Sequence, residues 1–241
     1  QVTAVYNKKP PFLIKNVNFV KANLTNIKDI ERVIKSHDIV IQAAANTSGI
    51  KDVIERPYVH VTENAIMNSL ILKSCYDNHV KKFIFFSCTV MYQTKSQPFL
   101  KNPVKETDFD PSSEIYPSYF GAGWTKVYIE KMCEFYSRLG RTKHYVIRHS
   151  NIYGPHDKYD LKNSHVFGAT ISKVLNKDSN IVSIWGDGSE ERDLLYISDL
   201  VDSVKKIIST KDKNPFYLFN IGSGKAISIK DLVCKIVEIA G

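Results

Sequence analysis

Two apolar runs, Asp38-Ile-Val-Ile-Gln-Ala-Ala-Ala45 and Lys82-Phe-Ile-Phe-Phe-Ser87, decide the fold of this chain. Each run has the length of a buried strand, and residues 61–78 between them repeat apolar side chains at helical spacing. Parallel neighbours in a sheet need a long crossover connection, and a helix supplies it. The two runs and the helix between them therefore predict a parallel sheet.

The same alternation extends in both directions along the chain. Further strands are predicted at residues 2–6, 17–21 and 144–148. Further helices are predicted after Asn26, which can cap the first turn, and over residues 125–139, where Gly140 would end the helix. Right-handed crossovers then give an α/β fold with a doubly wound, Rossmann-like parallel sheet, whose ligands bind at the carboxyl ends of the strands.

The composition of the sequence and the length of its predicted elements change near residue 150. Glycine and proline become more frequent, as in Gly154-Pro155, Gly186-Asp-Gly188 and Gly222-Ser-Gly224, and the predicted elements become shorter. We therefore predict a Rossmann-like domain over residues 1–150. Residues 151–241 would form mainly a smaller substrate lobe, with some elements returning to the sheet.

Composition and charge exclude several classes of protein. The 241 residues are 43% hydrophobic and 24% charged, which is typical of a globular chain, and no apolar run approaches the ~18 residues of a membrane span. The net charge of +8 attracts phosphate groups, but the lysines are spread along the chain, so a dedicated nucleic-acid surface is not expected. Four widely spaced cysteines fit no zinc cluster or disulfide framework and indicate a reducing, cytoplasmic setting.

A glycine-rich phosphate-binding turn should follow the first strand of a dinucleotide-binding fold, but the first glycine here is Gly49. The chain also lacks an initiator Met and ends at Gly241 within an apolar helical pattern. We interpret it as a fragment that lacks the first strand–helix unit and the C-terminal end; a processed or engineered chain is the alternative. Residues 2–6 would then be the second strand of the fold.

An ordered set of motifs runs through the chain. It comprises Ala43-Ala44-Ala45 after a strand, Asn64 in the next helix, Ser87-Cys88-Thr89 ahead of Tyr92, Lys126 opening a helix, Asn151-Ile-Tyr-Gly-Pro155, Arg192-Asp-Leu-Leu-Tyr-Ile-Ser-Asp-Leu200 and Phe219-Asn-Ile-Gly-Ser-Gly224. In this set the chain resembles the extended short-chain dehydrogenase/reductase family of NAD-dependent nucleotide-sugar epimerases, dehydratases and reductases. Tyr153-Gly-Pro-His-Asp157, Asn163-Ser-His165-Val and Cys133-Glu-Phe-Tyr136 are most similar to the GDP-fucose synthases, which act on a GDP-4-keto-6-deoxy sugar.

The resemblance implies a coenzyme, NAD or NADP, a nucleoside-diphosphate sugar as substrate, and a homodimer paired through helices. Implied cofactor-binding residues are Ala43, Ala44, Ala45, Asn64, Ser87 and Lys126, and implied substrate-binding residues are Asn151, His165 and Arg192. His165 would also be an acid/base, and Arg192 would hold the diphosphate. Trp185 would stack on a base or sugar, or would pack in the core. Lys8 and Lys9 after the first strand would suit the 2′-phosphate of NADP, or would be surface lysines.

The family's proton donor is a tyrosine four residues before the lysine, one helical turn away, where the ammonium lowers the pKa of the phenol. Here that position is Ala122. Tyr119 stands seven residues before Lys126, roughly 10.5 Å away along a continuous helix. Gly121 and Gly123 make a continuous helix doubtful, so Tyr119 or Tyr116 would fold back into the vacant space, or both would only pack.

The strand-end position that usually holds Ser or Thr is also altered, because Cys88 occupies it and a thiol is a weak hydrogen-bond donor. Thr89 would serve after a shift of one residue. The second catalytic residue of GDP-fucose synthase, a cysteine, corresponds to Val90, which leaves His165 without its thiol unless Cys88 replaces it. His149 stands where relatives usually have proline and is interpreted as a satisfied, buried histidine.

Two functions remain open. The first is an NAD(P)-dependent nucleotide-sugar epimerase, dehydratase or reductase that uses Lys126, Tyr119 or a water, Thr89 or Cys88, and His165. The second is a catalytically impaired binding module, either a nucleotide-sugar sensor or an RNA binder. The presence of Lys126, His165 and Arg192 together favours the enzyme, and Ala122 favours the module.

Overall fold

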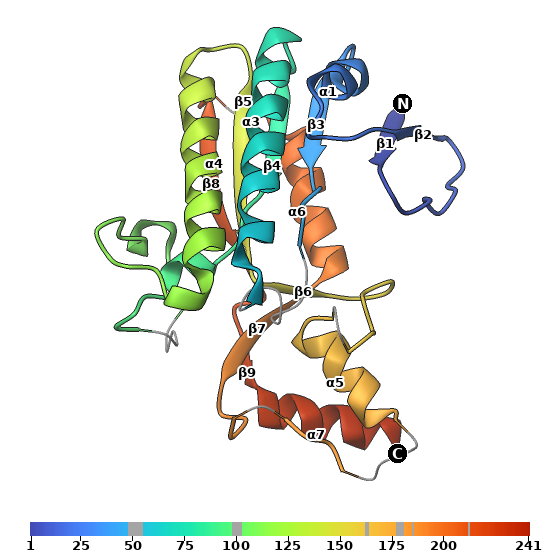
Figure 1. The fold of residues 1–241 in the computed structure, drawn as a ribbon, viewed down its shortest axis with the longest axis vertical. Helices are drawn as coiled ribbons and strands as arrows, with labels where there is room; N and C mark the ends of the chain where they lie inside the picture. Colours follow the sequence, from blue (N-terminus) through green and yellow to red (C-terminus); the bar gives the residue numbers. More distant parts are fainter. Residues whose placement is uncertain (48–54, 98–102, 162–163, 177–180, 185, 212) are drawn as a thin grey trace.

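The computed structural model describes residues 1–47, 55–97, 103–161, 164–176, 181–184, 186–211 and 213–241 (Figure 1). Its main sheet has the strand order β3 (Ile39–Gln42), β4 (Lys82–Phe86), β5 (Lys143–His149) and β8 (Phe216–Ile221). Each strand is parallel to its neighbour, with Ile41 opposite Ile84 and Ile84 opposite Tyr145. The predicted parallel sheet is confirmed.

Helices cover both faces of this sheet. On one face, α1 (Ile27–Ile34), α3 (Thr62–Asp77) and α4 (Phe120–Arg138) pack their apolar side chains against Phe83, Phe85 and Val146. On the other face, α6 (Ile197–Ser209) packs against Ile84 and Tyr145. Alternate residues of each strand therefore enter two separate cores, as a doubly wound fold requires.

Local sequence sets the helix ends largely as predicted. The Asn26 side chain accepts hydrogen bonds from the backbone N–H groups of Lys28 and Asp29, at 3.0 and 3.4 Å, and so caps α1. Gly140 follows the end of α4 with a φ of 80°, a left-handed conformation that glycine adopts without strain. The start of α4 was predicted too late, since the helix begins at Phe120 and not at residue 125.

The predicted break at Gly121 and Gly123 is wrong, because α4 is continuous through both residues. These glycines are sites of close approach. A Cβ on Gly121 would lie 2.8 Å from Cγ2 of Val61, and one on Gly123 would lie 3.0 Å from Cδ1 of Ile115. The packed neighbours compensate for the entropic cost of glycine in the helix.

Strands β1 (Val2–Tyr6) and β2 (Val17–Lys21) form a second sheet. They are parallel, with Val2 opposite Val17 and Tyr6 opposite Lys21. Within the described residues, this pair is a sheet of its own, and Figure 1 shows it beside β3. Ile41 of β3 is 45% exposed. The four-stranded sheet thus presents an apolar side chain to solvent at its β3 edge.

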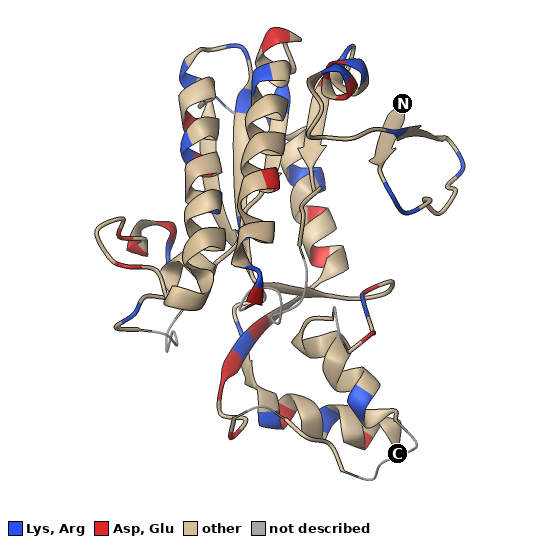
Figure 2. Cartoon of the chain, in the orientation of Figure 1, with Lys and Arg blue, Asp and Glu red and all other residues tan. Residues whose placement is uncertain are grey.

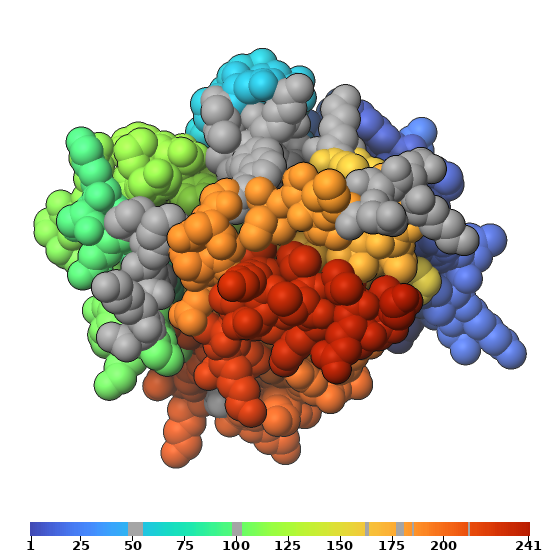
Figure 3. Space-filling model, turned by 90° about the horizontal axis from the view of Figure 1, so that it is seen from below, coloured from blue at the N-terminus to red at the C-terminus, as the bar shows by residue number. Residues whose placement is uncertain are grey.

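The C-terminal part builds a small mixed sheet beyond the carboxyl ends of the main strands. Strand β7 (Glu191–Tyr196) pairs in parallel with β6 (Asn151–Tyr153) and antiparallel with β9 (Ala226–Ser228). Helices α5 (Val166–Val174) and α7 (Ile229–Ala240) pack together below it. Figure 3 shows this end of the molecule, with α7, in red, in the middle of the face. The elements α6 and β8 belong to the main sheet layer.

Lys82 joins α6 to the sheet. Its ammonium donates hydrogen bonds to the backbone carbonyls of Ile207, Ile208 and Thr210, at 2.8, 2.8 and 2.6 Å. The last carbonyls of a helix have no partner within the helix and carry partial negative charge. A single lysine from β4 therefore caps this helix end.

The described residues contain no helix that is both long and apolar enough to cross a membrane. They also contain no group of three or more potential ligands for a metal ion. All four cysteines are free thiols, and Cys75 and Cys133 lie in the core on the α3–α4 side of the sheet.

The buried histidine His144 predicts a loss of stability in acid. Its ring is 0% exposed, Nδ1 lies 3.0 Å from the Thr142 carbonyl, and Nε2 has no hydrogen-bond partner among the described atoms. Burial lowers the pKa of His144 from 6.5 to about 4, so the unfolded chain binds a proton that the folded chain excludes. The free energy of unfolding should therefore fall by up to about 3 kcal/mol as the pH drops from about 6.5 to about 4, and this contribution should then level off.

Urea unfolding of His144→Phe at pH 7 and pH 4.5 measures this contribution. The variant keeps an aromatic ring beside Phe83, whose centroid is 5.6 Å from that of His144. It should lose less stability between the two pH values than the parent protein. His79→Asn, at an exposed position with a φ of 55°, is the control that should keep the parent slope, and equal slopes for all three proteins would refute the assignment.

Candidate functional site

Lys126 points from α4 to the carboxyl end of β4. Its ammonium lies 4.7 Å from the centroid of the Phe85 ring and donates a 2.7 Å hydrogen bond to the Phe86 carbonyl. Burial lowers the pKa of this lysine, and the nearby Cys88 and Glu130 act in the opposite direction. A positive charge is therefore held at the sheet edge where ligands of this fold bind.

The segment after β4 leaves the strand at once, so side-chain alternation does not continue beyond Phe86. Ser87 is 1% exposed, and its hydroxyl donates a 2.5 Å hydrogen bond to Glu130. Cys88 is half-buried, and burial raises the pKa of its thiol although the Lys126 charge opposes this. Thr89 is also half-buried and begins the short 3-10 turn η2 (Val90–Tyr92). Of the three, Cys88 is the residue whose pKa responds to Lys126.

Tyr119 ends the 3-10 turn η4 (Pro117–Tyr119), directly before α4. Its side chain packs against the cluster of Met91, Tyr92, Ile115 and Val127, as do Cys88 and Trp124. The ring of Tyr116 lies 6.1 Å from that of Tyr119. Tyr119 and Cys88 therefore share one apolar cluster, and the role of Tyr119 as proton donor stays a prediction.

His149 lies near Lys126, and His165 lies near His149. His149 ends β5 and is half-buried, with Nδ1 2.8 Å from the Ser150 carbonyl. Its pKa is lowered mainly by burial and further by electrostatic interaction with Lys126 and His165. His165 is exposed and stands directly before α5. The structure thus brings Lys126 and His165 toward a common neighbour, His149.

Ala43, Ala44 and Ala45 form an exposed segment of small residues after β3. Asn64 of α3 holds the residue that follows them: its Oδ1 accepts from the Asn46 N–H at 2.8 Å, and its Nδ2 donates to the Asn46 carbonyl at 2.9 Å. Asn64 is buried, so its direct role is to fix this segment. The exposed backbone of residues 43–45 leaves room for the close approach of a ligand.

Asn151 and Arg192 lie on the neighbouring strands β6 and β7. The Asn151 side chain donates to the Asp193 carbonyl at 3.3 Å, and Arg192 donates to the Glu191 carbonyl at 2.8 Å. Asn151 pairs with Leu194, so the two residues are close in register. Within the described part of the chain, no contact joins Arg192 to Lys126 or His165. Trp185 lies outside the described residues.

Asp193 is a residue of this region that the sequence analysis did not single out. Its carboxylate accepts hydrogen bonds from the Ser150 hydroxyl at 2.7 Å and from the N–H groups of Ser223 and Gly224, both at 2.8 Å. A Cβ on Gly222 would lie 2.9 Å from this carboxylate, so the loop approaches it closely. Asp193 therefore ties the end of β5 to the glycine-rich loop after β8.

A buried ion pair beneath the site was also missed. Arg148 of β5 donates to both carboxylate oxygens of Glu130, at 3.0 and 2.6 Å, and to the Tyr92 hydroxyl at 2.7 Å. The Tyr92 hydroxyl donates in turn to Asn220 of β8 at 2.8 Å. An arginine within an apolar strand was the available signal, because a buried charge requires a partner. Glu130 is four residues after Lys126 and so shares its helix face.

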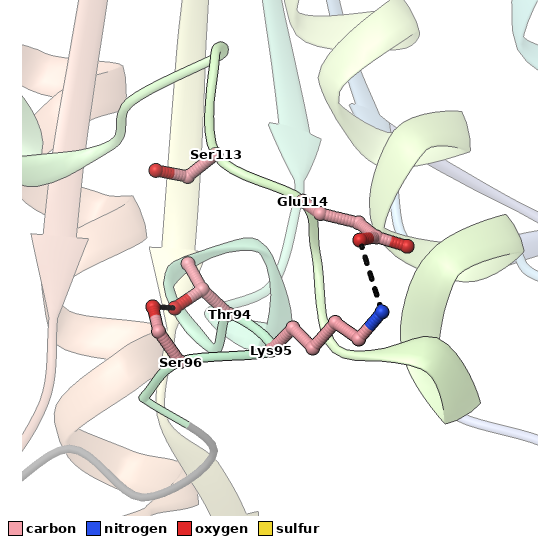
Figure 4. A pocket seen from close by; sticks show the side chains of 5 residues that line it. All are labelled: Thr94, Lys95, Ser96, Ser113 and Glu114. Atoms are coloured by element: carbon pink, nitrogen blue, oxygen red, sulfur yellow. Dashed lines mark hydrogen bonds and ion pairs between the residues drawn. The ribbon is translucent and has the colours of Figure 1, made fainter.

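A surface hollow of about 340 Å³ lies elsewhere, lined by Thr94, Lys95, Ser96, Ser113 and Glu114 (Figure 4). Lys95 and Glu114 form an ion pair across it at 3.6 Å, with both side chains exposed. None of the predicted site residues lines this hollow. It is distinct from the edge of the sheet where Lys126 lies.

Comparison with known proteins agrees with this arrangement. The model of the NAD dependent epimerase/dehydratase family matches residues 1–222. The GDP-L-fucose synthase of Sinorhizobium fredii (strain NBRC 101917 / NGR234) is 31% identical over 231 residues, which cover 92% of this chain and 71% of that protein. The GDP-L-colitose synthase of Yersinia pseudotuberculosis is 28% identical over 225 residues, with 91% and 71% covered.

Among solved structures, the UDP-glucose 4-epimerase of Thermotoga maritima, determined with UDP-glucose, superposes with a TM-score of 0.79. It is 26% identical, and the match covers 95% of this chain and 70% of that one. These findings confirm the resemblance drawn from the ordered motifs. The chain belongs to the NAD dependent epimerase/dehydratase family.

Proposed function

We propose that this protein is an NAD(P)-dependent epimerase/reductase that acts on a nucleoside-diphosphate sugar of the kind used by GDP-L-fucose synthases. The observation that carries the proposal is the Lys126 ammonium, held on the Phe86 carbonyl at the carboxyl end of β4, with His149 and His165 nearby. The similarity to GDP-L-fucose and GDP-L-colitose synthases supports the substrate class. The family proton donor is absent at Ala122, so we propose Tyr119 or a water as the proton donor. Cys88 or Thr89 would assist at the strand end, and His165 would act as an acid/base.

The described residues fit the nicotinamide-ribose half of the coenzyme. Lys126 offers a cationic donor for ribose hydroxyls, and the small residues Ala43–Ala45, held through Asn64, leave the backbone accessible. When bound, the nicotinamide accepts or returns a hydride. The exposed Lys8 and Lys9 after β1 support NADP over NAD.

Substrate residues are proposed at the mixed sheet. Asn151 and Arg192 lie on neighbouring strands, and the Arg192 guanidinium is suited to bind a diphosphate through bidentate hydrogen bonds. His165 at the start of α5 would reach the sugar. Lys and Arg are interleaved with Asp and Glu on helices of both parts (Figure 2), so we propose a small-molecule substrate and not a nucleic acid.

The alternative is a binding module that holds a nucleotide sugar without turning it over. The observations that favour it are Ala122 and the packing of Tyr119 in an apolar cluster. Nucleotide binding measured by NADPH fluorescence, followed by turnover of GDP-4-keto-6-deoxymannose with NADPH, separates the two. Binding with turnover supports the enzyme, and binding of sugar nucleotide without turnover supports the module as a sensor. Salt-sensitive RNA binding without nucleotide-sugar affinity would reject the enzyme and support the module as an RNA binder.

We also propose a homodimer formed through α3 and α4. These helices lie side by side and expose Ile66, Tyr128 and Phe135, which are 44%, 45% and 53% accessible. Pairing with a second copy would cover this apolar face. Sedimentation velocity should show a dimer for the parent protein and a monomer for Phe135→Lys. A monomeric parent protein would refute the proposal, and the exposed Val237→Lys on α7 is the control.

A further inference from the structure

His149 is a histidine at the sheet edge to which the proposed function assigns no role. Strands β4 and β5 run in parallel with Phe86, the last residue of β4, opposite Ile147, and His149 ends β5 two residues further on. Its ring meets the Phe86 ring edge-on, with the centroids 6.2 Å apart. The carbonyl of the same Phe86 accepts the hydrogen bond of Lys126. The His149 imidazole and the Lys126 ammonium therefore both contact Phe86, the last residue of β4.

The hydrogen bond of His149 determines which ring nitrogen is basic. A backbone carbonyl can only accept, so Nδ1, 2.8 Å from the Ser150 carbonyl, carries the proton. In the neutral ring, Nε2 then carries the lone pair. Within the described residues, Nε2 is neither hydrogen-bonded nor fully enclosed, so it is available to a ligand.

The charged surroundings keep this ring neutral. Lys126 comes from α4 and His165 from the start of α5, and both disfavour a second positive charge on His149. Burial acts in the same direction and is the main cause of its lowered pKa. The Asp193 carboxylate on β7 accepts from the hydroxyl of Ser150, the residue after His149, and from two backbone N–H groups, so these groups already occupy it. A neutral imidazole can accept a proton at its free ring nitrogen.

We propose that His149 is a catalytic residue that exchanges a proton with the reacting sugar hydroxyl, in place of the tyrosine missing at Ala122. The inference rests on the proposed function. When a sugar alcohol is oxidised, the carbon loses a hydride with its electron pair to NAD(P)⁺, and the hydroxyl oxygen loses its proton to Nε2. The products are a ketone, NAD(P)H and a His149 imidazolium. In the reductive direction, the imidazolium returns that proton to the oxygen as the hydride returns to the carbon.

The test compares His149→Gln with the parent protein and with the control His79→Asn. In the parent, kcat/KM should fall on the acid side with a midpoint below 6.5, as the base becomes protonated. In His149→Gln, kcat/KM should fall about 100-fold, the range for loss of a general base, and the acid limb should disappear. NADPH affinity should stay within about threefold, because coenzyme binding does not need the imidazole. The control should match the parent in all three measurements.

A second readout does not need turnover. Nitrogen NMR of the imidazole should show the tautomer protonated at Nδ1 at pH 7 and a titration midpoint below 6.5. Circular dichroism establishes that His149→Gln is folded, and His149→Asn is the second variant if it is not. A parent enzyme that turns over, with variants of unchanged kcat/KM and pH profile, or a His149 that titrates at 6.5 or above, would overturn this inference alone. A parent protein that binds no nucleotide sugar would overturn the proposed function and this inference with it.

Discussion

Lys126→Met is expected to lower kcat/KM with a nucleotide-sugar substrate about 100- to 10,000-fold, the range for loss of a positioned proton-transfer group. Methionine keeps the length of the side chain but removes the charge and the hydrogen bond to the Phe86 carbonyl. Without the ammonium, neither the ribose hydroxyls nor a nearby proton donor is oriented. Steady-state kinetics and NADPH fluorescence titration measure the two effects separately.

This loss should occur without unfolding. Burial lowers the pKa of Lys126, which means that the charged ammonium is less stable in the folded protein than in the unfolded chain. Removal of the charge should therefore leave the free energy of unfolding equal or higher. Lys131→Met is the matched control, because Lys131 is on the same helix with a side chain 73% exposed. Parent-like kinetics for Lys126→Met would place the chemistry elsewhere in the protein.

Glu130→Ala is expected to lower the free energy of unfolding by about 3–5 kcal/mol, the usual cost of breaking a buried ion pair. The side chains of Arg148 and Glu130 are 3% and 6% exposed, so the substitution leaves a guanidinium without its counter-charge in the core. The Ser87 hydroxyl loses its acceptor as well. Because small domains are stable by only about 5–15 kcal/mol, this loss is a large share of the total.

Urea unfolding of Glu130→Ala beside Glu134→Ala tests this expectation. Glu134 is on the same helix and pairs with Lys131 and Arg138, whose side chains are both 73% exposed. Its replacement should cost less than about 1 kcal/mol, since exposed ion pairs contribute little. The double variant Glu130→Ala/Arg148→Met removes both charges of the pair, and part of the lost stability should return. Equal losses for Glu130→Ala and Glu134→Ala would contradict the account.

Sequence patterns predicted the position of Lys126 better than the start of its helix. The ordered motifs marked Lys126 as a residue at the opening of a helix, and the family resemblance implied that it binds the cofactor. Propensity placed the start of α4 after the glycines, but the side chains of Val61 and Ile115 pack against Gly121 and Gly123 and extend the helix back to Phe120. Propensity measures the isolated helix, and tertiary contacts from distant segments override it.

The interpretation of His149 changed in a similar way. From the sequence alone, His149 was interpreted as a buried, satisfied histidine. The structure shows Nδ1 bonded, Nε2 accessible, and Lys126 and His165 nearby. The groups around His149 come from β5, α4 and α5, which meet at one edge of the sheet. No spacing of residues along the chain predicts that they meet there.

By itself, the sequence determined the parallel sheet, the helices on its two faces and the family, because strand and helix periods and ordered motifs are local properties of the chain. Only the tertiary structure decided which polar groups meet: Glu130 with Arg148 and Ser87, Asp193 with the loop after β8, and His149 with Lys126. Those partners are separated by many residues, and a buried charge or a basic nitrogen takes its character from the groups that folding places around it.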